Sequence, residues 1–173
     1  MHESAGMNSN PVDLHHAPLL TRLTAANGRY AGQGVNHLGE NFRGELEIRA
    51  CLDEQLIEIR FRATDADQAF HEESTWITED LLGGGLALWT VSTNTPGVLQ
   101  HRLQEDTRDG SYSTKAVFRL GDPSDLTRFR QEISLCVRHD GGIEYAYSWG
   151  VPHEAFGSRS RCLLQRLPVS SDN

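Results

Sequence analysis

The sequence predicts an all-β protein, a closed antiparallel up-and-down barrel of about ten strands with a short N-terminal helix. Three observations carry this prediction. Helical spacing of apolar residues largely disappears after Gly28, and several later segments alternate apolar and polar residues. Turn residues separate these segments at short intervals. An open sheet of ten such strands would leave two exposed edges, which closure into a barrel removes. A sandwich is the main alternative.

The helical pattern precedes Gly28. Leu19 and Leu23 lie at helical spacing, and Asn27-Gly28 is a plausible helix stop. Pro18 limits how early a continuous helix can begin. We therefore expect a short helix near residues 18–27, placed to plug one end of the barrel.

Turns divide the rest of the chain into strands. Asp53-Glu54 is short enough for a tight hairpin, and Asp140-Gly141-Gly142 is a strong hairpin signal. Alternation around Ile57 and Ile133 predicts one dry and one wet face. The ten expected strands are Arg29–Leu38, Phe42–Leu52, Leu56–Thr64, Phe70–Thr78, Leu86–Thr93, Val98–Glu105, Tyr112–Leu120, Arg128–His139, Ile143–Gly150 and Arg159–Leu167.

The 173 residues suit one domain with a single core. We expect a flexible tail over residues 1–12, one barrel domain over 13–167 and a C-terminal tail over 168–173. Hydrophobic residues make up 38% of the chain and charged residues 23%, a soluble globular composition. No run of 18 apolar residues is present, so no transmembrane helix and no membrane partner are expected.

Charge and cysteine usage narrow the function classes. The net charge of −8 disfavours nucleic-acid binding through a basic surface. The polar N-terminus lacks the apolar segment of a secretory signal, and three cysteines lie far apart, so we expect a cytoplasmic protein with reduced thiols. All but one of the 16 basic residues are arginine. Either genome composition or a need for planar anion-binding groups explains this bias.

Three segments resemble nitrobindin-like and fatty-acid-binding-protein-like barrels. Residues Gly28–Gly34 are similar to their G-x-[WY]-x-G-x-G start, Phe70–Trp76 to their F-H-[DE]-[DE] strand, and Arg159–Arg166 to a closing strand that ends in arginine. The chain is also similar to an uncharacterised bacterial family of the same type. The resemblance, over roughly residues 28–167, implies a calycin-like (lipocalin-like) barrel that encloses a ligand cavity.

The same resemblance implies that His71 faces this cavity. Nitrobindins bind haem through a histidine in the closing strands, but this sequence has no histidine after His153. Haem is therefore a disfavoured alternative, and the cofactor stays open. No H-E-x-x-H motif or C-x-x-C pair indicates a metal site.

Two strands carry the main candidate ligand-binding residues. His71 and Glu73 point the same way in a strand, so they form either an acid/base or ligand-orienting pair or a structural polar pair. Tyr145, Tyr147 and Trp149 alternate on one face of a later strand. They form either a stacking wall for a ligand or ordinary core packing.

Two further candidate ligand-binding residues lie on other predicted strands. His101 stands between Leu99 and Leu103 on an apolar strand face, as a core histidine or a polar anchor in the cavity. Arg161, with Arg159, is a candidate for holding a carboxylate, because the guanidinium fork matches two oxygens. The alternative for both arginines is a solvated outer face.

The predicted function is binding of a small, mostly apolar or aromatic ligand in the barrel interior. The alternatives are an enzyme that uses His71 and Glu73 for proton transfer, a haem-binding barrel, and a filled structural barrel. Barrels of this type often dimerise, so a homodimer is a further expectation.

Overall fold

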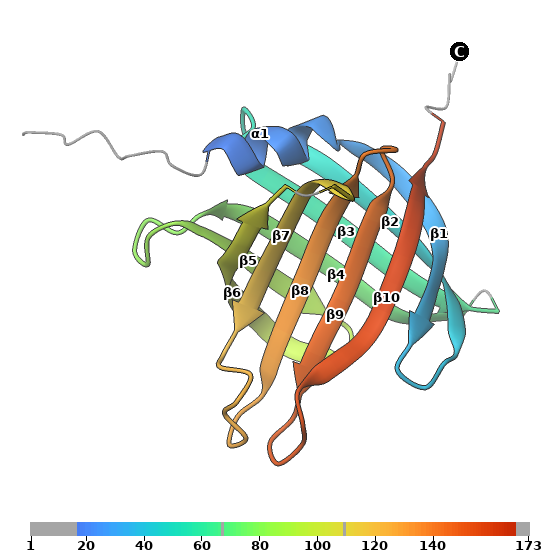
Figure 1. The fold of residues 1–173 in the computed structure, drawn as a ribbon, viewed down its shortest axis with the longest axis vertical. Helices are drawn as coiled ribbons and strands as arrows, with labels where there is room; N and C mark the ends of the chain where they lie inside the picture. Colours follow the sequence, from blue (N-terminus) through green and yellow to red (C-terminus); the bar gives the residue numbers. More distant parts are fainter. Residues whose placement is uncertain (1–16, 67, 109, 169–173) are drawn as a thin grey trace, which may run out of the picture.

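Ten antiparallel strands and one helix make up the computed structural model, which describes residues 17–66, 68–108 and 110–168 (Figure 1). The predicted tail 1–12 lies outside these residues, as does the predicted tail 168–173 beyond residue 168. In the described part, no helix is long and apolar enough to cross a membrane. The elements are α1 (Ala17–Ala25), β1 (Gly28–Asn36), β2 (Asn41–Cys51), β3 (Leu56–Asp65), β4 (Gln68–Glu79), β5 (Leu86–Ser92), β6 (Thr95–Thr107), β7 (Tyr112–Leu120), β8 (Arg130–Arg138), β9 (Ile143–Gly150) and β10 (Gly157–Arg166).

The strands form a closed up-and-down barrel, as predicted. Each strand pairs antiparallel with its sequence neighbours, and β1 pairs with β10 from Tyr30↔Arg166 to Asn36↔Ser160 to close the ring. β6 begins at Thr95 rather than at Val98, because a two-residue turn lets Ser92 pair with Thr95. Because the ring closes, each of these ten strands pairs with a neighbour on both sides.

Two glycines in β1 allow close packing against the neighbouring strands. A Cβ atom at Gly32 would collide with the backbone carbonyl of Leu163 on β10. A Cβ at Gly34 would collide with the ring of Phe42, which lies over it from the neighbouring strand β2. The glycine-rich start of β1 therefore has a steric cause, because the backbone must approach its neighbours closely.

The half of the barrel next to α1 is packed with aliphatic side chains. Leu19 and Leu23 of α1 are fully buried at this end, as are Ile48 and Ile57 on the barrel wall. The hydroxyl of Tyr30 donates a 2.6 Å hydrogen bond to the carbonyl of Ala26, just past the helix end. This satisfies one of the carbonyls that a helix leaves unpaired. The prediction that the helix plugs one end is confirmed.

Arg130 holds the chain together by hydrogen bonds at the end of the barrel opposite α1. Its side chain is fully buried, and its guanidinium donates to the carbonyls of Arg128 (2.8 Å), Gly150 (3.2 Å), Val151 (2.9 Å) and Glu154 (2.8 Å). These bonds tie the β9–β10 loop to the start of β8. This residue was not among those predicted from the sequence. The loop that Arg130 holds forms part of the rim of the cavity described next.

Candidate functional site

Strands β4 and β9 stand five places apart in either direction around the ring, so they face each other across the interior. Glu73 on β4 points inward and meets two tyrosines of β9. The hydroxyl of Tyr145 donates a 2.5 Å hydrogen bond to Oε1 of Glu73, and the hydroxyl of Tyr147 donates to Oε2. These bonds cross the barrel interior. The aliphatic core that begins at α1 extends as far as these bonds.

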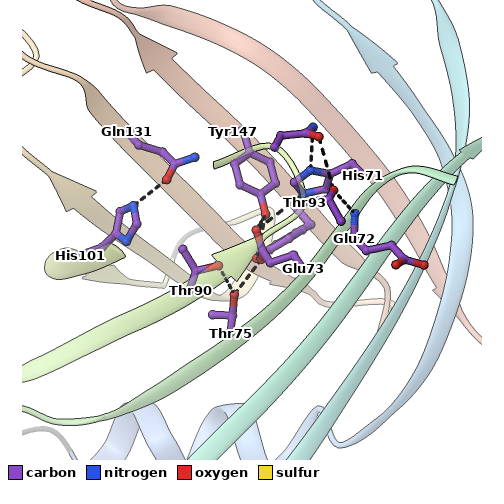
Figure 2. A network of polar contacts seen from close by, with 11 residues as sticks. His71, Glu72, Glu73, Thr75, Thr90, Thr93, His101, Gln131 and Tyr147 are labelled. Carbon is purple, nitrogen blue, oxygen red and sulfur yellow. Dashed lines mark hydrogen bonds and ion pairs between the residues drawn. The ribbon is translucent and has the colours of Figure 1, made fainter. Parts of the chain in front are cut away.

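Two threonines extend the network (Figure 2). The hydroxyl of Thr75 lies 2.8 Å from Oε1 of Glu73 and 2.9 Å from the hydroxyl of Thr90. A hydroxyl has one proton, so Thr75 donates to the carboxylate and accepts from Thr90. Three hydroxyl groups therefore direct their protons at one carboxylate.

Glu73 is an ionised group in a buried position. Burial alone raises the pKa of a carboxyl, but the nearby His71 ring and the hydrogen bonds from Tyr145, Tyr147 and Thr75 outweigh it and hold the pKa of Glu73 below its usual value. Burial and the charge of Glu73 raise the pKa of both tyrosines well above the usual range. The stable arrangement is thus a carboxylate surrounded by neutral phenols.

His71 lies beside this carboxylate. Its Nε2 is 3.7 Å from Oε2 of Glu73, and its Nδ1 is 3.1 Å from the side-chain nitrogen of Asn94. In this orientation the Asn94 amide donates, so Nδ1 accepts and Nε2 carries the proton. Nε2 is buried and has no hydrogen-bond partner in the part of the chain that the structure describes. His71 therefore brings an uncommitted N–H group to the carboxylate.

A cavity of about 360 Å³ opens at the end opposite α1. This volume is within the usual range for small-molecule sites. His71 and Tyr147 lie at its inner part, and side chains from several strands and loops form its walls. The aromatic lining residues are Phe42, Phe61, Phe70, Phe129, Tyr147 and Trp149, and polar lining residues include His37, His71, Asn94, Gln131 and Arg159.

A larger hollow of about 680 Å³ lies over β1 to β5. Much of its lining consists of outward-facing charged side chains that already form ion pairs, such as Arg43 with Glu45 and Arg62 with Glu72. Glu73 borders this larger hollow, but converging aromatic rings distinguish the smaller cavity, which is the better candidate site.

The structure brings together five of the seven residues that the sequence analysis selected. His71, Tyr147 and Trp149 line the cavity, and Glu73 and Tyr145 lie directly beneath it. As predicted, His71 shares the inward face of its strand with Glu73, and Trp149 follows the two tyrosines on β9.

His101 is a core residue beside this group. It is fully buried, and its Nε2 lies 2.9 Å from Oε1 of Gln131, which lines the cavity. Burial lowers the pKa of His101, so the neutral form is favoured. His101 thus lies in the core, with Gln131 between it and the cavity.

Arg161 points away from the interior, so the expected inward orientation is wrong. It forms a 2.6 Å ion pair with Glu144 on the outer surface, while Cys162 and Leu164 take the inward positions of β10. A bulge between Ser158 and Ser160 breaks the alternation that placed both arginines on one face. Arg161 is a solvated surface residue.

Arg159 lies at the cavity rim instead. Its guanidinium carbon is 4.1 Å from the ring centroid of Trp149, its Nε donates to the Trp149 carbonyl, and its terminal nitrogen is 3.7 Å from Glu154.

Sequence reasoning missed Gln131, Thr90 and Asn94. Gln131 precedes Ile133 by two residues, so alternation placed it on the inward face. Thr90 likewise continues the inward series of Leu86 and Leu88. Both signals were present in the sequence. Asn94 lies in a turn, where no periodic signal exists.

Strand β10 supplies no histidine ligand for haem. The inward side chains of β10 at the expected ligand strand are Cys162 and Leu164, and burial raises the pKa of the Cys162 thiol to about 12. A thiol with this pKa is protonated at neutral pH and is a poor iron ligand. Across residues 17–66, 68–108 and 110–168, no group of three or more His, Cys, Asp and Glu side chains is arranged to hold a metal ion.

Comparison with known proteins places the chain at the level of fold. No family model matches the sequence, and no curated protein matches it. The crystal structure of Rv2717c from M. tuberculosis superposes with a TM-score of 0.64 at 12% identity, over 88% of this chain and 99% of that chain. The CRL protein of Arabidopsis superposes with a TM-score of 0.54 at 9% identity, over 88% and 97%. These likenesses support the barrel fold alone.

Proposed function

We propose that this barrel binds a small, mostly apolar molecule in the cavity opposite α1. The observation that carries the proposal is the change in packing halfway along the interior. Aliphatic side chains fill the half next to α1, whereas the bonds from Tyr145 and Tyr147 to Glu73 end that packing. Beyond them lies a cavity with aromatic walls and a few polar groups, the usual composition of a ligand pocket.

Binding is favoured over proton transfer by His71 and Glu73. Both carboxylate oxygens already accept hydrogen bonds, and Glu73 is almost completely buried beneath Tyr147. The lowered pKa makes this carboxylate a weak base. The arrangement suits a fixed charge better than a proton acceptor.

Trp149 provides a direct readout, because it lines the cavity. The other two tryptophans, Trp76 and Trp89, pair across β4 and β5 on the outer face. In a W76F/W89F background, titration with tert-butylbenzene should change the Trp149 fluorescence saturably. Native mass spectrometry of protein purified from cells should additionally detect a retained small molecule.

A matched pair of variants localises the binding. Ala63 lines the cavity, so Ala63→Leu should fill part of it and weaken the response at least about tenfold. Thr64→Leu adds similar bulk at the next position on β3, whose side chain faces outward, and should leave the response unchanged. Folded protein that gives no saturable response and retains no small molecule would contradict the proposal.

A further inference from the structure

The barrel interior holds a negative charge that is not neutralised by arginine or lysine. In the ion pairs of the described residues, the one partner of Glu73 is His71, at 3.7 Å. The hydrogen-bond donors Thr75, Tyr145 and Tyr147 stabilise the carboxylate but carry no charge themselves. A charge in a low-dielectric interior acts over a longer range than the same charge in water. Glu73 therefore contributes a negative potential to the cavity next to it.

The floor of the cavity offers a hydrogen-bond acceptor, the hydroxyl oxygen of Tyr147. Tyr147 lines the cavity, and its single proton is directed at Glu73 (Figure 2). A ligand that reaches this hydroxyl therefore meets its oxygen lone pairs. The bond to a carboxylate also polarises the phenol and makes that oxygen a stronger acceptor. Negatively charged ligand groups are disfavoured at this point.

The walls suit a cation. The rings of Phe61, Phe70, Tyr147 and Trp149 line the cavity, and the face of an aromatic ring attracts positive charge. The cavity rim already shows this contact, because the guanidinium of Arg159 lies over the ring of Trp149. The charge of Arg159 is balanced at the rim by Glu154, at 3.7 Å, whereas Glu73 has a histidine and no arginine or lysine as its ion-pair partner among the described residues.

We propose that the ligand of this cavity is a small organic cation, an ammonium group with an alkyl or aryl body, rather than a carboxylate. This inference rests on the proposed function, that the cavity binds a small molecule. The cationic group would lie against Tyr147 and the neighbouring rings, with Glu73 behind them as the fixed counter-charge. The aryl or alkyl body would fill the outer part of the cavity.

Three probes of similar shape test the charge preference. Phenyltrimethylammonium is cationic, tert-butylbenzene is its neutral counterpart with carbon in place of nitrogen, and benzenesulfonate is anionic. Titrations followed by Trp149 fluorescence, at one pH and ionic strength, should show the cation binding at least about tenfold more tightly than the neutral probe. Benzenesulfonate should bind most weakly.

Neighbouring variants identify the source of the preference. Glu73→Gln should reduce the ratio of cation to neutral affinity to less than about threefold, because it removes the charge and nearly keeps the shape. Glu72→Gln is the matched control. Its side chain lies on the outer face and pairs with Arg62, so the ratio should stay at the wild-type value.

A second variant covers the case in which Glu73→Gln does not fold. Phe61→Leu keeps an apolar wall but removes a ring face, so the affinity for the cation should fall several-fold more than the affinity for the neutral probe. Equal losses for both probes would overturn the inference.

The outcomes separate the two proposals. If tert-butylbenzene binds as tightly as the cation or more tightly, the cation inference is overturned and the proposed function stands. If neither probe binds to folded protein, both proposals fail. A cation preference that survives Glu73→Gln would overturn the role of Glu73.

Discussion

Tyr145 donates a 2.5 Å hydrogen bond to Glu73 from the opposite wall of the barrel. The two residues are 72 positions apart in sequence, on strands that never pair. Strand pairing holds each wall together, but it does not determine which side chains meet across the barrel interior. This bond and that of Tyr147 connect the two walls directly and mark the boundary between packed core and cavity.

The first prediction concerns the hydrogen bond from Tyr145 to Glu73. Tyr145→Phe removes one donor from a buried carboxylate, so the free energy of unfolding should fall by about 1.5–3 kcal/mol. Tyr112→Phe is the control, because Tyr112 makes a similar 2.9 Å bond to Glu144 on the outer face, where loss of the bond should cost less than about 1 kcal/mol. Urea denaturation measures both. Equal effects would contradict the bridging role.

The second prediction concerns acid stability. The pKa of Glu73 is lower in the folded protein than its usual value of 4.5, so its ionised form stabilises the fold above about pH 4.5. This contribution disappears as the pH falls through the folded pKa. The difference in unfolding free energy between wild type and Glu73→Gln should therefore shrink below pH 4.5.

Urea denaturation from pH 7 to pH 3 measures this difference. Asp80, Asp122 and Asp140 also have lowered pKa values, but they are present in both proteins and cancel in the comparison. A wild-type advantage that stays constant down to pH 3 would show that folding does not lower the pKa of Glu73.

The third prediction concerns the helix plug. Leu23 of α1 is fully buried against the barrel core, so Leu23→Ala should lower the free energy of unfolding by about 2–5 kcal/mol. Ala25 lies on the exposed side of the same helix, and Ala25→Gln should change stability by less than about 0.5 kcal/mol. Thermal unfolding compares the two. Similar melting temperatures for both variants would mean that α1 is dispensable.

The fourth prediction concerns Arg130. Arg130→Met leaves four carbonyl groups without their donor and should destabilise the protein by about 3 kcal/mol or more. Arg130→Lys should recover only part of this, because an ammonium cannot reproduce the planar fork. Arg128→Met, two residues earlier and exposed, serves as the control. Hydrogen exchange should show loss of protection in the β9–β10 loop of the methionine variant.

The fold was predictable because it follows from local signals. Alternation and turn residues placed all ten strands, and nearest-neighbour pairing then left ring closure as the way to remove both edges. The Thr93-Asn94 turn was harder to predict, because Pro96 and Gly97 resemble a loop although both lie within β6.

The candidate site was only partly predictable. The family resemblance implied that His71 faces inward, and alternation placed Glu73 on the same face. The contact of Glu73 with Tyr145 depends on how the ring closes, which no local pattern encodes. Arg161 was misplaced because one bulge residue in β10 reverses the facing of the residues beyond it. The ion pair of Arg161 with Glu144 is likewise a cross-strand relationship that only the register reveals.

The pairing of β1 with β10 has a consequence for synthesis. The chain leaves the ribosome N-terminus first, so β1 lacks its second neighbour until the eight strands between them and β10 itself have emerged. Its open edge can meanwhile template association with other nascent chains. A protein truncated before Gly157 would keep that edge permanently, and we expect such fragments to aggregate instead of folding.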